Sequence, residues 1–267
     1  MEALKTHPLY LTNGKEEVTL GVIVEKGFCY EIHEGEFKGE KCLIQTFEKK
    51  DIVDNRIAKL LNAHTQLNHP HIVSLVALCE DDEYVYLIYP YYETNLERVR
   101  KDLTLKKGAS ILIQVVEAVK YIIQMNWIHR DIKPSNIWMK RTAEGWDVVI
   151  GGMLFCFEMN GSTRFMGTPD YMPPEALRQQ PFDPVKLSVF AIGRTIEFVL
   201  AKFNGTAPAS GLQDLIQREP PIFTNVNDPQ LHPVVKELLQ RCLVGDAEKR
   251  TIKLDEIIAL LNKIINE

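Results

Sequence analysis

Short apolar stretches separated by turn residues occupy the first third of the chain. Between residues 18 and 46, three such stretches (VTLGVIVE, FCYEIH and EKCLIQTF) are interrupted by Gly35 and Gly39, which is typical of antiparallel strands joined by tight turns. Apolar positions at helical spacing over 51–67 predict one helix. Two further strand-like stretches cover 72–79 and 84–89. We therefore expect a small sheet with one helix against it.

After residue 92 the pattern changes to long segments that are apolar on almost every side. GASILIQVVEAVKYIIQ and PVKLSVFAIGRTIEFVLAKF are typical of helices enclosed within a protein, and HPVVKELLQRCL and KLDEIIALLNKIIN of closing amphipathic helices. The expected fold class is α+β, with a strand-rich lobe over about 18–90 and a helical lobe over about 93–262. Residues 1–17 form an N-terminal extension in this division. A cleft between two lobes is where a ligand is normally bound.

Composition narrows the classes of partner. The 31 Lys and Arg residues against 36 Asp and Glu give a formal net charge of −5, so we expect neither a nucleic-acid binder nor a protein that binds anionic membranes. There is no signal peptide and no apolar run near the roughly 18 residues of a membrane span, which favours a cytoplasmic location. The cysteines are scattered and odd in number, which predicts buried thiols and no disulfide or metal site. They are Cys29, Cys42, Cys79, Cys156 and Cys242.

Residues 128–137, with the sequence IHRDIKPSNI, closely resemble the catalytic loop of the eukaryotic protein kinases in its Ser/Thr-type form. Residues 167–175, GTPDYMPPE, resemble the segment that closes the kinase activation loop. Arg250 stands where the family places an arginine that pairs with the glutamate at Glu175. The resemblance implies the two-lobed protein kinase fold over residues 18–262.

The matched loop residues have two interpretations. Asp131, Lys133 and Asn136 match the family's base, phosphate-contacting and metal-ligand positions. A structural role is equally consistent with them, because a base has little to act on without bound, metal-neutralised ATP. The resemblance implies structural roles at five more positions: His129, Arg130, Thr168, Glu175 and Arg250.

Several parts of the family's phosphate and metal site are replaced in this chain. Matching the family pattern places Gln45 at the strand lysine, Leu60 at its glutamate partner and Gly152 at the metal-binding aspartate. A neutral amide cannot clamp phosphates, and a glycine side chain cannot ligate magnesium. In the glycine-rich loop only Gly27 is retained, and Tyr30 adds a bulky ring where the backbone must approach phosphate.

The adenine site is expected to be filled by the chain's own side chains. Leu43 stands where the family has a small alanine above the adenine, Trp138 where it has an aliphatic residue below, and Tyr89 at the gatekeeper. The alternative is that Trp138 turns aside and stacks on adenine. Lys26 is the best placed of the nearby lysines to replace the missing positive charge.

The main expectation is therefore a catalytically inactive pseudokinase that is not an enzyme and holds no cofactor or metal. It would act as a protein-interaction scaffold or allosteric regulator of a protein partner, with an active kinase as one candidate. The alternatives are an unconventional Ser/Thr kinase of weak activity that uses ATP and magnesium, and an ATP-binding sensor.

Ser188 replaces the family's aspartate on the central helix, which predicts a less rigid catalytic loop. The sequence leaves open whether Ser162, Thr163 or Thr168 is phosphorylated.

Overall fold

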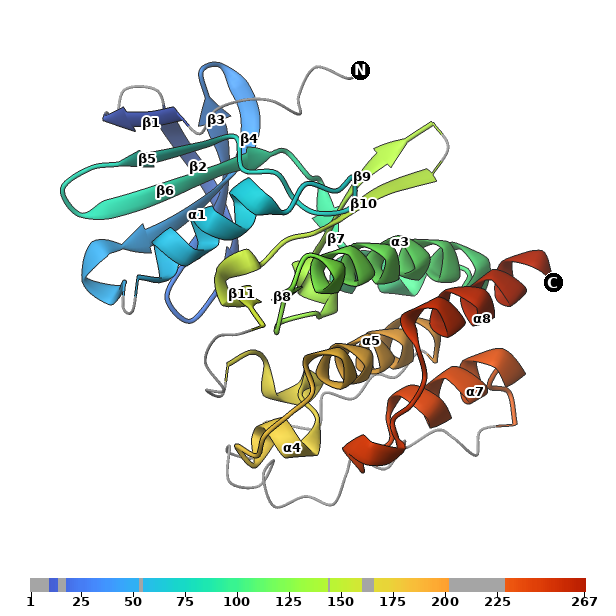
Figure 1. The fold of residues 1–267 in the computed structure, drawn as a ribbon. Coiled ribbons are helices and arrows are strands. Elements are labelled where there is room, and N and C mark those ends of the chain that lie inside the picture. The colour runs from blue at the N-terminus through green and yellow to red at the C-terminus, as the bar shows by residue number, and fades with distance from the viewer. Residues whose placement is uncertain (1–9, 14–17, 53–54, 144, 160–165, 202–228) are drawn as a thin grey trace. The chain divides into compact units, whose positions relative to one another are not determined.

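The computed structural model describes residues 10–13, 18–52, 55–143, 145–159, 166–201 and 229–267. The chain divides into two compact units (Figure 1). The first contains residues up to Asn68 together with Ile72–Glu93, and the second contains His69–His71 together with Thr94–Glu267. None of the helices in the described ranges is long and apolar enough to cross a membrane.

The first unit is built on a six-stranded sheet in the order β1-β5-β6-β4-β3-β2. Its neighbouring strands are antiparallel except for β1 and β5, which run parallel with Tyr10 opposite Ala77. The sequence analysis leaves residues 1–17 outside the domain, whereas Tyr10–Asn13 forms a strand of this sheet. The strands are β1 (Tyr10–Asn13), β2 (Val18–Lys26), β3 (Glu31–Phe37), β4 (Glu40–Glu48), β5 (Ala77–Glu80) and β6 (Tyr84–Pro90).

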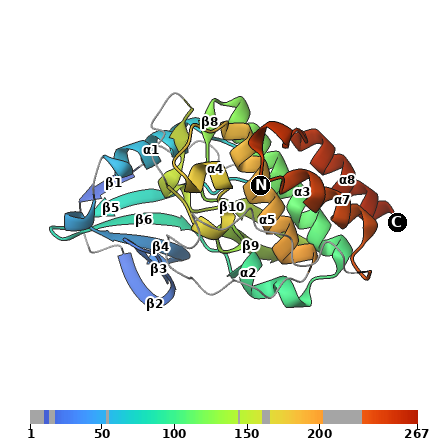
Figure 2. The ribbon, with the colours of Figure 1, turned by 90° about the horizontal axis from the view of Figure 1, so that it is seen from below.

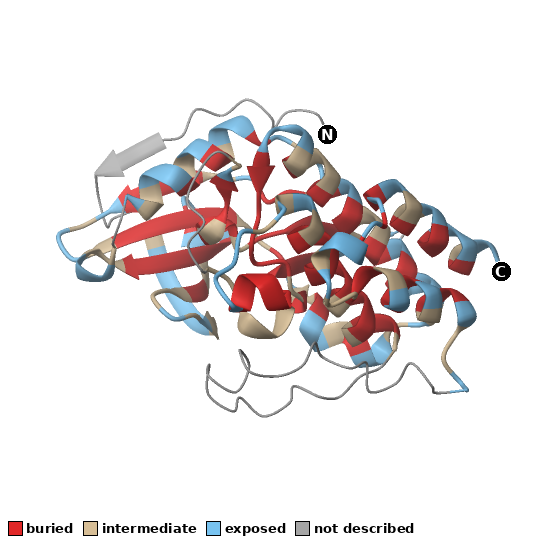
Figure 3. Ribbon diagram, turned by 60° about the horizontal axis from the view of Figure 1, so that its bottom comes forward, coloured by how far each residue is buried: buried red, intermediate tan, exposed pale blue. Residues whose placement is uncertain are grey.

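The buried residues of the first unit come from the strands of the sheet and from the helix α1 (Arg56–Gln66). Leu60 and Ala63 are the buried residues of α1. Ile44 and Ile88 are fully buried in a cluster of apolar side chains from the sheet. Burying each such side chain contributes about 1.5–3 kcal/mol. Figure 3 shows the buried residues gathered in the strands and on the inner sides of the helices.

Two predicted elements of the first unit begin later than the apolar pattern indicates. The helix predicted from residue 51 is preceded by a 3₁₀ turn, η2 (Lys49–Asp51), and α1 begins at Arg56. The strand predicted over 72–79 begins at Ala77, although Ile72 and Val73 are buried. An apolar residue can be buried in the core without being part of a strand, so these boundaries could not be read from hydrophobicity alone.

In the described part of the second unit, four long helices pack side by side (Figure 2). α3 (Leu105–Gln124) packs against α5 (Pro184–Leu200) and α8 (Leu254–Asn266), and α7 (Pro233–Cys242) packs against α5 and α8. These helices match the four helical segments expected from the sequence. The short elements are β7 (Thr94–Asn95), α2 (Leu96–Val99), η3 (Arg100–Asp102), β8 (Trp127–Ile128), η4 (Pro134–Asn136), β9 (Ile137–Thr142), β10 (Gly145–Ile150), η5 (Met153–Phe155), β11 (Phe157–Glu158), η6 (Pro169–Tyr171), α4 (Pro174–Leu177) and η7 (Ala247–Lys249).

Side-chain caps fix where the two central helices start. The Thr104 hydroxyl accepts a hydrogen bond from the Lys107 N–H at 3.3 Å at the start of α3. At the start of α5 one carboxylate oxygen of Asp183 accepts from the N–H groups of Val185 and Lys186, at 2.7 and 3.2 Å. Such caps satisfy N–H groups that have no partner within the helix, and each contributes about 1 kcal/mol.

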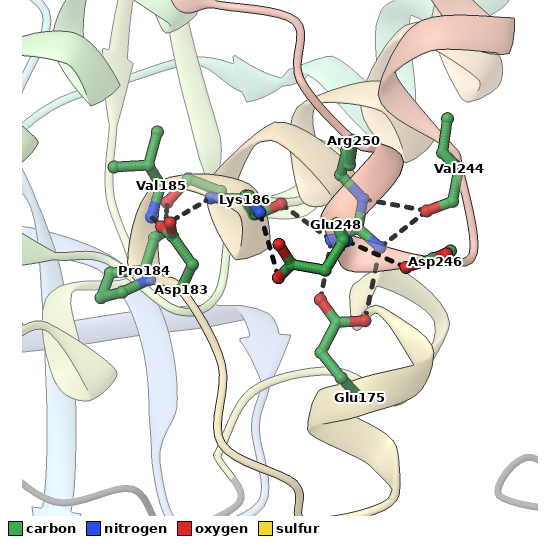
Figure 4. A network of polar contacts seen from close by, with 10 residues as sticks. Glu175, Asp183, Pro184, Val185, Lys186, Val244, Asp246, Glu248 and Arg250 are labelled. Carbon is green, nitrogen blue, oxygen red and sulfur yellow. Dashed lines mark hydrogen bonds and ion pairs between the residues drawn. The ribbon is translucent and has the colours of Figure 1, made fainter.

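A buried ion pair joins α4 to the segment before α8, as Figure 4 shows. The Arg250 guanidinium donates from Nη1 and Nη2 to the two carboxylate oxygens of Glu175, at 2.7 and 3.3 Å. Its Nε and Nη2 also donate to the main-chain oxygen of Val244, at 3.0 and 2.7 Å, and Nη1 donates to that of Lys186 at 3.1 Å. The pairing that the resemblance implies for Arg250 and Glu175 is therefore confirmed.

Candidate functional site

Three polar side chains of the second unit meet around the carboxylate of Asp131. Thr168 Oγ1 donates to Asp131 Oδ1 at 2.6 Å, and Asn136 Nδ2 donates to Asp131 Oδ2 at 2.8 Å. Lys133 Nζ lies 3.2 Å from Asp131 Oδ2 and donates to Thr168 Oγ1 at 2.8 Å. Asp131 and Asn136 are buried. The catalytic-loop residues that the resemblance singles out thus form one connected network with Thr168.

Side chains of this network occupy most of the acceptor sites of the Asp131 carboxylate. An ionised carboxylate has about four lone-pair sites for hydrogen bonds, and Thr168, Asn136 and Lys133 occupy three of them in this structure. The remaining site can accept a hydrogen bond from a substrate hydroxyl, as a general base requires. The Lys133 ammonium supplies positive charge beside the same carboxylate, where a transferring phosphoryl group would need it.

His129 ties the catalytic loop to the end of β10. Its Nδ1 accepts from the Asp131 N–H at 3.2 Å, and its Nε2 donates to the main-chain oxygen of Gly151 at 2.8 Å. These two partners require a neutral ring that carries its proton on Nε2. Burial lowers the pKa of His129, which favours that neutral form.

Arg130 has the left-handed φ of +67° and is buried. Its Nη1 donates to the Met166 sulfur at 3.7 Å, and its guanidinium carbon lies 4.9 Å from the centre of the Phe157 ring. Arg130 therefore contacts two residues of the activation segment, Phe157 near its start and Met166 further along. Ser162 and Thr163, the candidate modification sites within that segment, lie outside the described residues.

The Ser188 hydroxyl bonds within its own helix. Its hydroxyl donates to the main-chain oxygen of Pro184 at 2.9 Å, one turn earlier in the same helix. A serine in a helix often makes this bond to its own backbone. The less rigid loop that Ser188 predicts stays a prediction.

Gly152 lies against Asn136. Gly152 has a φ of +67°, and a Cβ atom there would be 2.4 Å from Asn136 Cγ. The Asn136 amide is already hydrogen-bonded to Asp131. Among the described residues, no group of three or more His, Cys, Asp or Glu side chains could hold a metal ion. Gly152 therefore brings no side-chain oxygen to the two positions at which the family holds a divalent cation.

Trp138 packs against the neighbouring glycine. Its side chain comes from β9 and is buried, and a Cβ atom on Gly151 would be 2.6 Å from the indole Cε2. The indole therefore covers the backbone at the end of β10. The filling of an adenine slot by Trp138 stays a prediction.

In the first unit, Tyr30 covers the one retained glycine of the glycine-rich loop. A Cβ atom on Gly27 would be 2.3 Å from the Tyr30 ring. The Tyr30 hydroxyl donates to Glu25 Oε1 at 3.0 Å, and the ring centre lies 5.9 Å from that of Phe47. Phosphate could approach this glycine closely only after the ring had moved.

Gln45 belongs to a neutral polar cluster where the family has an ion pair. Its Oε1 accepts from the Tyr89 hydroxyl at 3.4 Å, and that hydroxyl lies 3.5 Å from His64 Nε2 on α1. Burial raises the pKa of Tyr89 and lowers that of His64 to about 4, so both are uncharged at neutral pH. Leu60 is buried one helical turn before His64, and Leu43 is buried on β4. His64 was not among the predicted site residues, although its i, i+4 spacing from Leu60 was an available signal.

The structure also describes Lys26 of the first unit and the five cysteines of the chain. Lys26 Nζ lies 2.7 Å from Glu31 Oε1, with its side chain 68% exposed. The ammonium proposed as a replacement charge therefore already has a carboxylate partner. Cys29 is half-buried, the other cysteines are buried, and all five have free thiols.

The chain belongs to the protein kinase family, because the family described as Protein kinase domain matches residues 25–259. A protein of Acanthamoeba polyphaga mimivirus with a provisional serine/threonine-protein kinase name is 27% identical over 217 residues, or 76% of this chain and 79% of the viral protein. An Aurora kinase of Yarrowia lipolytica is 27% identical over 221 residues, or 78% of this chain and 57% of that kinase. A mouse protein named as an inactive serine/threonine-protein kinase is 26% identical over 211 residues, or 73% of this chain and 33% of its own length.

These comparisons overturn the expectation that the chain is not an enzyme. The family match and the relatives named as kinases point to a protein kinase enzyme, although one relative is named as inactive. The expectation gave too much weight to single positions such as Gln45 and Gly152. Phosphoryl transfer depends on positioning and charge supplied by many groups together, and the Asp131 network supplies some of both.

Proposed function

We propose that the chain is an unconventional serine/threonine protein kinase of weak activity, with ATP as its phosphoryl donor. The observation that carries the proposal is the network around Asp131, in which Thr168, Asn136 and Lys133 fix the carboxylate and leave one acceptor site. The names of the related kinases support the same reaction class.

In this reaction the oxygen of a serine or threonine hydroxyl attacks the terminal phosphorus of ATP. The new O–P bond forms as the bond to the bridging oxygen breaks and ADP leaves, and Asp131 accepts the hydroxyl proton. Lys133 offsets negative charge on the group in transfer. The reaction is expected to be slow, because Gln45 is neutral and Gly152 brings no carboxylate.

We expect Asp131→Asn to lower phosphate transfer by about 100-fold, because an amide cannot accept the hydroxyl proton. The measurement is transfer of labelled phosphate from ATP to serine and threonine peptides, with magnesium, with manganese and with a chelator. The matched control is Asp147→Asn, which removes a carboxylate of β10 that lies 3.2 Å from Lys140 Nζ, and it should keep wild-type transfer. Wild-type protein without transfer under all three conditions, or an active Asp131→Asn variant, would show that the proposal is wrong.

A further inference from the structure

Two consecutive glycines at the end of β10 each lie against a side chain from one short segment. Gly151 lies against Trp138, and Gly152 lies against Asn136. The backbone between them is held from two sides, since the Gly151 N–H donates to the Asn136 main-chain oxygen at 2.7 Å and the Gly151 oxygen accepts from His129. The glycines therefore cannot easily move away from the two side chains.

The orientation of the Asn136 amide follows from its partners. Its nitrogen lies 2.7 Å from the main-chain oxygen and 2.8 Å from the Oδ2 atom of Asp131. Both partners are acceptors, so the atom that faces them must be the NH₂ group. The amide is thus used as a donor that holds the Asp131 carboxylate.

The space that this orientation needs is available only beside a glycine. A Cβ atom on residue 152 would lie 2.4 Å from Cγ, 2.5 Å from Nδ2 and 2.6 Å from Oδ1 of Asn136. With a Cβ atom at residue 152, either this side chain or the backbone of residue 152 would have to shift. The left-handed φ of +67° at Gly152 disfavours other residues further.

We propose that Asn136 is a positioning residue for Asp131 and not a metal ligand in this chain, and that Gly152 is the residue that makes room for it. The part of this inference that concerns the reaction rests on the proposed kinase function. The part that concerns the paired residues does not, so the two can fail separately.

The first experiment exchanges the donor for an acceptor in the absence of metal. We expect Asn136→Asp, melted in EDTA at pH 7.5, to unfold at least 4 °C below wild type and below Asn136→Ala, because it sets two carboxylates against each other. A residue that served only as a metal ligand would tolerate the exchange in EDTA. Wild-type melting of Asn136→Asp under these conditions would overturn the inference.

The second experiment measures the coupling between the two residues by a double-mutant cycle. The matched control is Gly39→Ala, since Gly39 also has a left-handed φ, of +79°, but a Cβ atom there would meet nothing within 4 Å. We expect Gly152→Ala to lower the melting temperature by several degrees more than Gly39→Ala. This excess should disappear when Gly152→Ala is combined with Asn136→Ala. An equal effect of Gly152→Ala in both backgrounds would overturn the inference.

The third experiment separates the two roles in the reaction. If labelled phosphate transfer is measurable, Asn136→Ala should lower kcat by about 10-fold and leave the magnesium concentration for half-maximal activity unchanged. A large increase in that magnesium concentration would overturn the inference that Asn136 is not a metal ligand. If the wild-type protein shows no transfer, the proposed function fails, and the two melting experiments still decide whether Asn136 and Gly152 act as a pair.

Discussion

Replacing Arg250 by methionine is expected to lower the free energy of unfolding by about 3–5 kcal/mol, because the change leaves a buried charge without its partner. The Arg250 side chain is fully buried and donates to Glu175, Val244 and Lys186. Without it, the Glu175 carboxylate and two main-chain oxygens lose these donors in a site that little water reaches. In thermal unfolding the loss should lower the melting temperature by about 10 °C for a chain of this size.

Two variants provide the controls. One is a double variant that combines Arg250→Met with Glu175→Leu, and the other replaces the surface residue Arg241. The double variant removes both charges and should be more stable than Arg250→Met alone, because it leaves no unpaired carboxylate. Arg241 pairs with Glu237 and Glu256 while its side chain is 38% exposed, and Arg241→Met should cost less than about 1 kcal/mol. A loss for Arg250→Met as small as that for Arg241→Met would contradict the expected result.

Acid is expected to destabilise the first unit through His64. Burial lowers the pKa of its folded-state ring from 6.5 to about 4. Between these two pH values the unfolded chain binds a proton at His64 and the folded chain does not, so the free energy of unfolding falls as the pH falls. The full effect of this one group is about 3 kcal/mol, lost progressively from pH 6.5 down to pH 4. His129 acts in the same direction, because burial lowers its pKa as well.

Urea unfolding of the wild type and of His64→Gln, from pH 8 to pH 4.5, measures this contribution. Glutamine keeps a neutral polar group beside Tyr89 but does not titrate, so the variant should lose about 2–3 kcal/mol less than the wild type over that range. The difference between the two proteins at pH 8 reports only the changed packing. If the free energy of unfolding falls equally with pH in the two proteins, His64 titrates alike in the folded and unfolded chain, and the expected result is wrong.

The sequence predicted the long elements well and the short paired ones poorly. The helices α3 and α5 are apolar on almost every side, and a helix needs only local hydrogen bonds, so their patterns are visible in the chain itself. Strand β1 has four residues, and its position depends on parallel pairing with β5, more than 60 residues away. A contact of that kind leaves no periodic pattern in the sequence.

The candidate site and its surroundings likewise contain one contact that could be predicted from the sequence and one that could not. The Arg250–Glu175 pair was predictable because both residues match a family pattern, and the structure brings them together. The contact between Asn136 and Gly152 was not predictable, because a missing side chain does not say what fills its space. The prediction that the chain is not an enzyme was wrong, as the family match and the relatives named as kinases show. It gave the replaced residues Gln45 and Gly152 more weight than the retained Asp131, Lys133 and Asn136.

The two adjoining glycines between β10 and η5 also limit which substitutions this chain can accept. Restoring the family's aspartate at Gly152 by one mutation would place a Cβ atom 2.4 Å from the Asn136 side chain. The Asn136 side chain or the backbone at residue 152 would have to shift to admit that atom. A carboxylate at this position therefore calls for a second, compensating change close by.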